Sequence, residues 1–200
     1  MLTVLTPTGA RPEAFAACVA LMRGQTHPGP VRWVIVDDGP EPMPVPAIAG
    51  WEIVHVRPWP LWAPGQNTQA RNLAAGLDRV TDRVVVVEDD DWYAPWWLAR
   101  CAEWLEADEL VGEAPSLYRH RNGAERDMGN TGHASLCSTA LKGAAIAEMK
   151  RICAEGGTGI DIRLWRRGGR LYPPTPRGVV GIKGWPGRPG IGVGHRMRAA

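Results

Sequence analysis

The sequence lacks several features that would assign it to a common class of protein. Its four cysteines are scattered, without the paired spacing of zinc sites or the density of small secreted domains. No apolar run approaches the roughly 20 residues that a membrane helix needs. The first residues lack the basic and apolar regions of a secretory signal. These absences predict a cytoplasmic protein with reduced thiols and no membrane segment.

Acidic residues are absent after Asp161. Up to that residue, 21 Asp and Glu stand against 14 Lys and Arg, a net charge of −7, whereas the rest of the chain carries nine basic residues. A basic segment of this kind suggests a polyanionic or phosphate-bearing partner. Folding of the segment back onto the acidic body explains the same pattern.

Alternating strand and helix patterns fill the first hundred residues. Strands are predicted at 2–6, 31–36, 52–56 and 83–87, of which 2–6 and 83–87 are expected to be buried, and helices at 11–23 and 66–80. This order is typical of an α/β doubly wound domain with a mainly parallel central sheet. The length of 200 residues and the apolar content of 44% suit one such domain.

The second half of the chain has a mixed pattern. Helices are predicted at 94–105 and 138–153, and a small antiparallel hairpin at 117–129 around Asn122 and Gly123. The stretch 178–194 is rich in Gly and Pro, and we expect it to form an ordered loop or lid.

The strongest chemical signal is the junction between the apolar strand 83–87 and the four consecutive acids 88–91. Ligands of open α/β sheets bind at the carboxyl ends of the strands, where these acids would emerge. Their carboxylates repel one another unless a cation lies among them, and they suit Mg²⁺ or Mn²⁺. The alternative is a solvated turn that caps the helix beginning near Pro95, and for Asp91 this alternative stays open.

Four motifs follow one another in the first hundred residues, and their order and spacing are informative. They are PTGAR (7–11), VIVDDG (34–39), GQNTQARN (65–72) and VVVVEDDDWYAP (84–95). In order and spacing they resemble the GT-A glycosyltransferases, most closely the family 2 type. The resemblance implies a single GT-A domain over 1–200. Its parts would be a nucleotide-sugar-binding half (1–110), an acceptor-side half (111–177) and a basic Gly/Pro-rich C-terminal segment (178–200).

The resemblance also implies how the donor, a UDP-sugar, would be held. Thr8 and Arg11 of the first motif lie where the family contacts the nucleobase, and Pro7 belongs with them to the nucleotide-sugar-binding residues. Asp37 or Asp38 would accept the imide N–H of uracil, and Arg71 would contact the diphosphate. Turn chemistry before Gly39 is the alternative for the two aspartates, and a surface position is the alternative for Arg71.

For the metal, Mn²⁺ or Mg²⁺, the resemblance places Asp90 at the main coordinating position. Glu88 and Asp89 would hold the ribose and the outer shell of the metal, although Glu88 replaces the family's usual Asp. His195 would join as a second ligand when the lid folds over the donor. A solvated terminal histidine is the alternative.

The resemblance also implies an inverting displacement. GTGIDIRLWRRG (157–168) looks like the family segment that carries the catalytic base, which makes Asp161 the base. Ile160 replaces the usual Glu there, and a helix-cap role for Asp161 is the alternative. The QxxRW signature of processive relatives is absent, so transfer of a single hexose is expected.

The acceptor stays open. Six of the ten tryptophans lie near the expected site in sequence: Trp59, Trp62, Trp92, Trp96, Trp97 and Trp104. Aromatic platforms stack sugars and bases, so with the basic segment they make a hydroxymethylated base in DNA, or another polyanion, one acceptor class. Saccharide, lipid and protein hydroxyls are the others, and the tryptophans could equally fill the core.

Two other function classes remain. A nucleotidyltransferase would need a Gly-rich loop with a lysine after the first strand, whereas PTGARPE has one Gly and no Lys. A non-catalytic nucleic-acid-binding module would use the basic segment alone.

Overall fold

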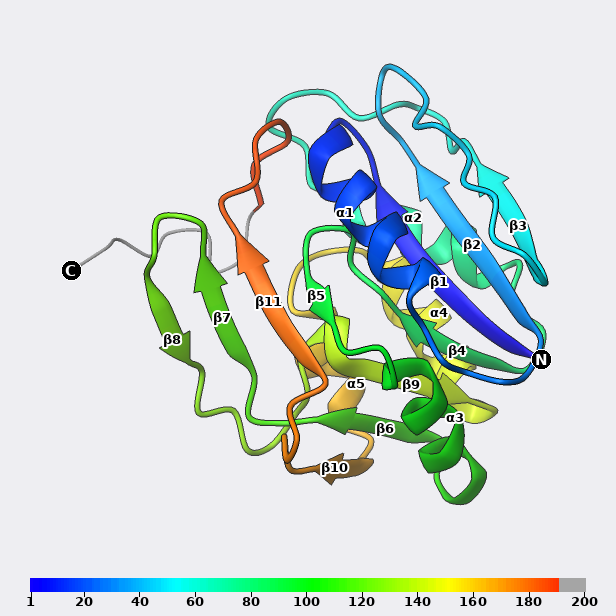
Figure 1. The fold of residues 1–200 in the computed structure, drawn as a ribbon, viewed down its shortest axis with the longest axis vertical. Coiled ribbons are helices and arrows are strands. Elements are labelled where there is room, and N and C mark those ends of the chain that lie inside the picture. Colours follow the sequence, from blue (N-terminus) through cyan, green and yellow to red (C-terminus); the bar gives the residue numbers. More distant parts are fainter. Residues whose placement is uncertain (191–200) are drawn as a thin grey trace.

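The computed structural model describes residues 1–190, which form a central seven-stranded sheet beside a smaller four-stranded sheet (Figure 1). The strand order in the central sheet is β10-β6-β9-β4-β1-β2-β3. In that order the strands are β10 (Arg170–Tyr172), β6 (Leu110–Glu113), β9 (Thr139–Lys142), β4 (Arg83–Val86), β1 (Leu2–Thr8), β2 (Val31–Asp37) and β3 (Trp51–Val56).

Most neighbours in the central sheet are parallel. Strands β3, β2, β1 and β4 run in the same direction, and β6 is parallel to β10, whereas β9 is antiparallel to both β4 and β6. The predicted α/β fold with a mainly parallel sheet is therefore confirmed. The parallel strands bring their carboxyl ends to one edge, where Thr8 is paired with Asp37.

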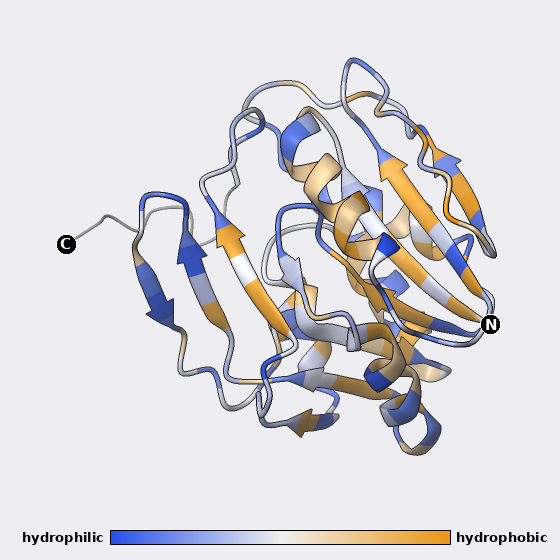
Figure 2. Ribbon diagram, in the orientation of Figure 1, coloured by the Kyte–Doolittle hydropathy of each residue, from blue (hydrophilic) through white to orange (hydrophobic). Residues whose placement is uncertain are grey.

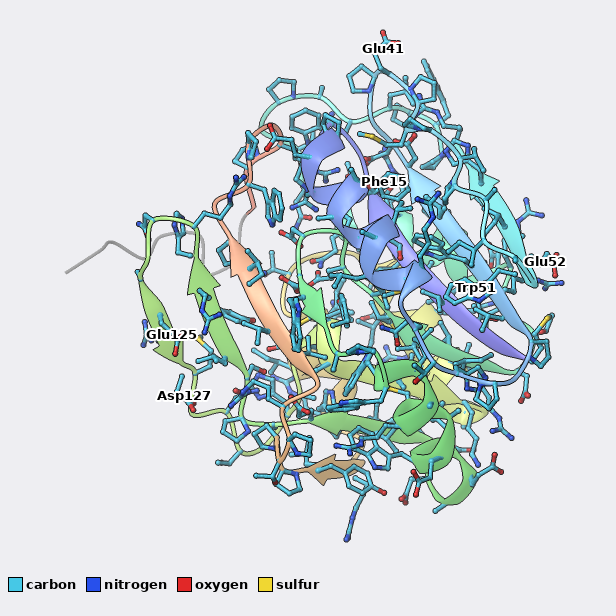
Figure 3. All side chains as sticks on the ribbon, viewed as in Figure 1. Phe15, Glu41, Trp51, Glu52, Glu125 and Asp127 are labelled. Atoms are coloured by element: carbon cyan, nitrogen blue, oxygen red, sulfur yellow. The ribbon has the colours of Figure 1, made fainter. Side chains whose placement is uncertain are left out.

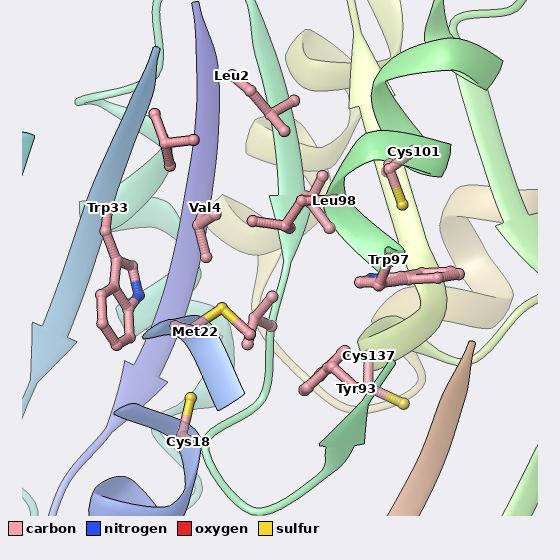
Figure 4. Packing of buried hydrophobic residues seen from close by; sticks show 14 of the residues in the cluster. Leu2, Val4, Cys18, Met22, Trp33, Tyr93, Trp97, Leu98, Cys101 and Cys137 are labelled. Atoms are coloured by element: carbon pink, nitrogen blue, oxygen red, sulfur yellow. The ribbon is translucent and has the colours of Figure 1, made fainter. Parts of the chain in front are cut away.

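Helices cover both faces of this sheet. They are α1 (Pro12–Arg23), α2 (Gln69–Leu77), α3 (Trp97–Ala107), α4 (Ala144–Glu155) and α5 (Ile160–Trp165). Side chains alternate along a strand, so Val4 faces the core beneath α1 and α3, while Leu5 faces the core beneath α2, α4 and α5. Figure 4 shows Val4 with Met22 and Leu98 in the first core. Both faces are buried, which explains the apolar runs in these strands.

The smaller sheet has the strand order β5-β11-β7-β8. Its strands are β5 (Trp92–Tyr93), β11 (Val179–Lys183), β7 (Leu117–His120) and β8 (Glu125–Asp127). Figure 2 shows β11 as apolar and the outer hairpin of β7 and β8 as polar. In Figure 3, Glu125 and Asp127 lie on the outermost strand, far from the central sheet. The predicted hairpin around Asn122 and Gly123 is confirmed.

Two sequence predictions are wrong in part. The helix predicted at 138–153 begins only at Ala144, because the 3₁₀ turn Leu136–Ser138 and strand β9 come first. Strand β9 supplies the backbone partners that β4 and β6 both need, and Gly143 at φ 56° separates it from α4. The stretch 178–194 was expected to be a loop or lid, yet residues 179–183 form the buried strand β11.

None of the helices in residues 1–190 combines the length and hydropathy of a membrane span.

Candidate active site

The acids at the end of β4 are held by cations of the protein itself. Arg11 donates to Asp90 Oδ2 at 2.8 Å and also to Asp89, which accepts a second hydrogen bond from Thr8 Oγ1 at 2.6 Å. Burial raises the pKa of Asp89 to about 6, although the Arg11 guanidinium opposes this shift. The end of β1 and the loop after it therefore contact the acids that follow β4. This agrees with the expectation that the carboxyl ends of parallel strands meet at one edge of the sheet.

Asp91 faces the smaller sheet. Its Oδ1 accepts hydrogen bonds from the Ile182 backbone N–H at 2.8 Å and the Lys183 ammonium at 2.9 Å. Burial raises the pKa of Asp91, and the positive charge of Lys183 opposes this. The following helix begins at Trp97. The alternative that made Asp91 the cap of that helix is therefore wrong, because its carboxylate is committed to β11.

Glu88 is the partly exposed member of the four acids. Its carboxylate accepts a hydrogen bond from the Gln69 side-chain amide at 2.8 Å. Burial and the neighbouring charge of Asp91 raise the pKa of Glu88. Glu88, Asp91 and Cys137 have ligand atoms within 4.8 Å of one another. The Cys137 thiol is neutral, since burial raises its pKa, and Lys183 already occupies this cluster as a cation, so the cluster does not suit a soft metal.

The two aspartates at the end of β2, Asp37 and Asp38, differ in their surroundings. Asp37 accepts hydrogen bonds from the backbone N–H groups of Gly39 at 3.0 Å and Met43 at 2.7 Å, and pairs with Arg57 at 2.8 Å. This is the turn chemistry considered as the alternative. Asp38 instead accepts hydrogen bonds from three side chains of two other segments: Thr68 and Arg71 (3.2 Å) at the start of α2, and Arg188 (2.8 Å) after β11.

Three of the residues that hold this edge were not named as site residues from the sequence. They are Lys183, Trp185 and Arg188, of which Trp185 donates its indole N–H to the Asp90 carbonyl at 2.8 Å. The available signal was the basic, acid-free C-terminal segment. In the described part of this segment, Arg167 pairs with Glu109 at 3.1 Å, Lys183 pairs with Asp91 and Arg188 pairs with Asp38. These three ion pairs favour the alternative in which the basic segment folds back onto the acidic body.

Sequence comparison identifies the family. The family model for glycosyl transferase family 2 matches residues 3–162 of the 200. The chain belongs to glycosyl transferase family 2. No curated protein matches it by sequence.

Family 2 membership agrees with the fold of solved structures. S. aureus TarS 1–349 in complex with UDP has a TM-score of 0.61 at 10% identity, covering 90% of this chain and 60% of that one. The mannosyltransferase PcManGT from Pyrobaculum calidifontis, in complex with GDP-Man and Mn²⁺, has a TM-score of 0.56 at 15% identity, covering 90% and 56%. S. aureus TarS itself gives 0.61 at 10% identity, with coverages of 90% and 36%.

At these identities the likeness shows the fold alone, and the fold is GT-A. The chain spans 36–60% of the length of these three solved chains. The resemblance to the GT-A glycosyltransferases of family 2, which the four sequence motifs indicated, is confirmed.

The remaining site residues that the family resemblance implied are Asp161, Pro7, Arg71 and His195, and no hydrogen bond or ion pair given for the described ones joins them to acids 88–91. Asp161 is in the first turn of α5, half-buried, and its Oδ1 accepts a hydrogen bond from the Ile162 N–H at 2.9 Å. Pro7 lies within β1, and Arg71 lies in α2 beside Asp38. His195 lies outside the described residues.

The charge of the acidic cluster fits a divalent cation. Residues 88–91 supply four carboxylates, and within residues 1–190 their ion pairs with Arg11 and Lys183 supply two positive charges, so these six groups sum to −2 when all are ionised. Burial raises the pKa of Glu88, and repulsion from the negative charges of Asp91 and Asp90 raises it further, as expected where carboxylates are crowded. Carboxylate oxygens are the ligands that Mg²⁺ and Mn²⁺ prefer.

Proposed function

We propose that this protein is a metal-dependent inverting glycosyltransferase. It would transfer one hexose from a nucleotide diphosphate sugar, with a UDP-sugar as the expected donor, to an acceptor hydroxyl. The observation that carries the proposal is a cluster of four carboxylates, paired with two cations among the described residues, at the carboxyl edge of a GT-A sheet. The neighbours in complex with UDP, and with GDP-Man and Mn²⁺, support a donor of this class.

Two arginines at this edge of the sheet, Arg11 beside Asp89 and Arg71 beside Asp38, each carry a guanidinium donor without a partner among the described residues. The Nε atoms of Arg11 and Arg71 are buried and have no hydrogen-bond partner among the described residues. A buried N–H without a partner is costly, and phosphate oxygens are strong acceptors for guanidinium groups. These two donors therefore support binding of the diphosphate between the loop after β1 and helix α2.

In the proposed reaction, Asp90 would hold the metal, and Glu88 would assist it. When bound, the metal would neutralise the charge that develops on the leaving diphosphate. Asp161 takes the proton of the acceptor hydroxyl. The hydroxyl oxygen then forms a bond to the anomeric carbon as the bond from that carbon to the diphosphate oxygen breaks, with inversion.

The acceptor is proposed only as a hydroxyl group. Two of the tryptophans near the site in sequence are exposed, Trp59 at 83% and Trp92 at 39%, whereas Trp97 is buried in the core. Exposed aromatic rings can stack the face of a sugar or of a hydroxymethylated base in DNA, so they support either acceptor class. The described basic residues that pair with acids of the body weaken the case for DNA from charge alone.

The test is a transfer screen with the full chain. UDP-sugars and GDP-sugars are incubated with Mn²⁺ or Mg²⁺, with saccharide acceptors or hydroxymethylated DNA, and products are identified by mass spectrometry. We expect release of the nucleoside diphosphate, whereas a nucleotidyltransferase would release pyrophosphate. The absence of binding and turnover for every nucleotide sugar, with either metal, would refute the proposal.

Variants separate the proposed roles. Asp161→Asn is expected to lower kcat by at least about 100-fold while donor affinity is kept, because the base acts on the acceptor. Asp90→Asn should weaken the dependence on metal. Asp82→Asn is the matched control, since Asp82 precedes β4 at the opposite end of the strand and is exposed. Equal activity of Asp161→Asn and the wild type would exclude Asp161 as the base.

A further inference from the structure

Residues 184–190, here called the strap, lie across the carboxyl edge of the central sheet. Within the strap, the Trp185 indole donates to the Asp90 carbonyl at 2.8 Å, and the Arg188 backbone N–H donates to the Ala10 carbonyl at 3.1 Å. Figure 1 shows this segment, after β11, turning beside the amino end of α1. The strap thus touches the strand ends that are proposed to bind the donor.

The Arg188 side chain fills a specific position at this edge. Its guanidinium donates to Asp38 Oδ1 at 2.8 Å and to Thr68 Oγ1 at 2.6 Å. The same group lies 5.1 Å from the centre of the Trp62 ring. The Arg188 side chain is only 14% exposed, and that of Asp38 is fully buried.

These contacts are the ones that a nucleobase would make. A guanidinium is a planar group with N–H donors at its edge, and it stacks on aromatic rings. A uracil ring stacked on Trp62 would likewise present an imide N–H to the Asp38 carboxylate. The second oxygen of Asp38 already accepts hydrogen bonds from Thr68 and Arg71, so Arg188 holds the oxygen that an incoming base would need.

We propose that Arg188 occupies the nucleobase subsite as an internal mimic of the base, and that the nucleotide binds by displacing the strap. This inference rests on the proposed function. If the donor binds only when the strap is released, its apparent Kd equals the intrinsic Kd divided by the fraction of molecules with a released strap. A strap that is mostly docked therefore lowers the apparent affinity for the donor.

The backbone of the strap is suited to local release. Gly184 and Gly187 both have positive φ, at 86° and 95°. A Cβ atom at Gly187 would lie 2.1 Å from the Ala10 carbonyl oxygen, so docking requires glycine at this position. Release at this point leaves β11 in place, because Lys183 still pairs with Asp91.

The experiment measures UDP binding by calorimetry in the wild type and three variants of the full chain. Arg188→Ala removes the mimic, and Gly187→Ala disrupts docking while Arg188 remains. We expect both to bind UDP about tenfold more tightly than the wild type. Arg167→Ala is the control, because Arg167 belongs to the same basic segment but pairs with Glu109, and its UDP affinity should be unchanged.

Hydrogen exchange provides a second measurement on the wild type. Addition of UDP should speed amide exchange across residues 184–190, whereas a lid that closes over the nucleotide would slow it. Unchanged or weaker UDP binding in both variants, or slower exchange with UDP, would overturn the inference while the proposed function stands. If neither the wild type nor any variant binds a nucleotide, both the proposed function and the inference fail.

Discussion

Replacement of Lys183 by methionine tests how the acidic cluster is held together. The Lys183 ammonium lies 2.9 Å from Asp91 Oδ1, and the side chains of the pair are 7% and 0% exposed. Burial by itself would lower the pKa of Lys183, but Asp91, Asp90 and Glu88 raise it well above its ordinary value. Methionine keeps most of the volume of lysine but leaves Asp91 buried with no cation beside it.

The expected cost follows from that burial. Removing one partner of a buried ion pair typically destabilises a protein by about 3–5 kcal/mol. That is a large share of the total stability of a domain, which is about 5–15 kcal/mol. For a chain of this length, each kcal/mol shifts Tm by roughly 2–4 °C, so Lys183→Met should lower Tm by about 6–20 °C.

Denaturant unfolding of a double-mutant cycle with Asp91→Asn measures the pair directly. In the Asp91→Asn background the cost of Lys183→Met should fall by about 1–3 kcal/mol, because no buried charge is left without a partner. Lys150→Met is the control, since the Lys150 pair with Asp78 is exposed and should contribute less than about 1 kcal/mol. A Lys183→Met variant as stable as this control, or a cost independent of residue 91, would refute the reasoning.

Three further predictions concern the core, pH and metal. Gly76→Ala should destabilise the chain by about 1–2 kcal/mol in denaturant unfolding despite better helix propensity, because its Cβ would lie 2.1 Å from Leu5 Cδ1; a stabilised variant would contradict this. Burial raises the pKa of Glu113, so its carboxyl favours folding below its unfolded pKa and loses that contribution as pH rises. The stability of Glu113→Gln relative to the wild type should therefore increase from pH 4 to pH 8, and a flat difference would argue against it. Mn²⁺ at 100 times its Kd should stabilise the wild type and Asp82→Asn by about 2.7 kcal/mol in thermal unfolding but not Asp90→Asn, and equal stabilisation of all three would exclude Asp90 as a ligand.

Local patterns in the sequence were enough to predict the first half of the fold. Strands β1, β2 and β4 are apolar on both faces because helices cover both sides of the sheet, and such runs are visible without a structure. Parallel pairing then brings the ends of these strands to one edge, so the acids 88–91 could be placed beside Thr8 and Asp37. The family motifs lie in this same half.

Only the tertiary structure decided which cations meet these acids. Lys183 and Asp91 are 92 residues apart, and Arg188 and Asp38 are 150 apart, so no local pattern links them. The composition of the C-terminal segment indicated its charge but not its partners. Strand β9 was missed for a related reason, since its conformation depends on the open edges of β4 and β6 rather than on its own four residues.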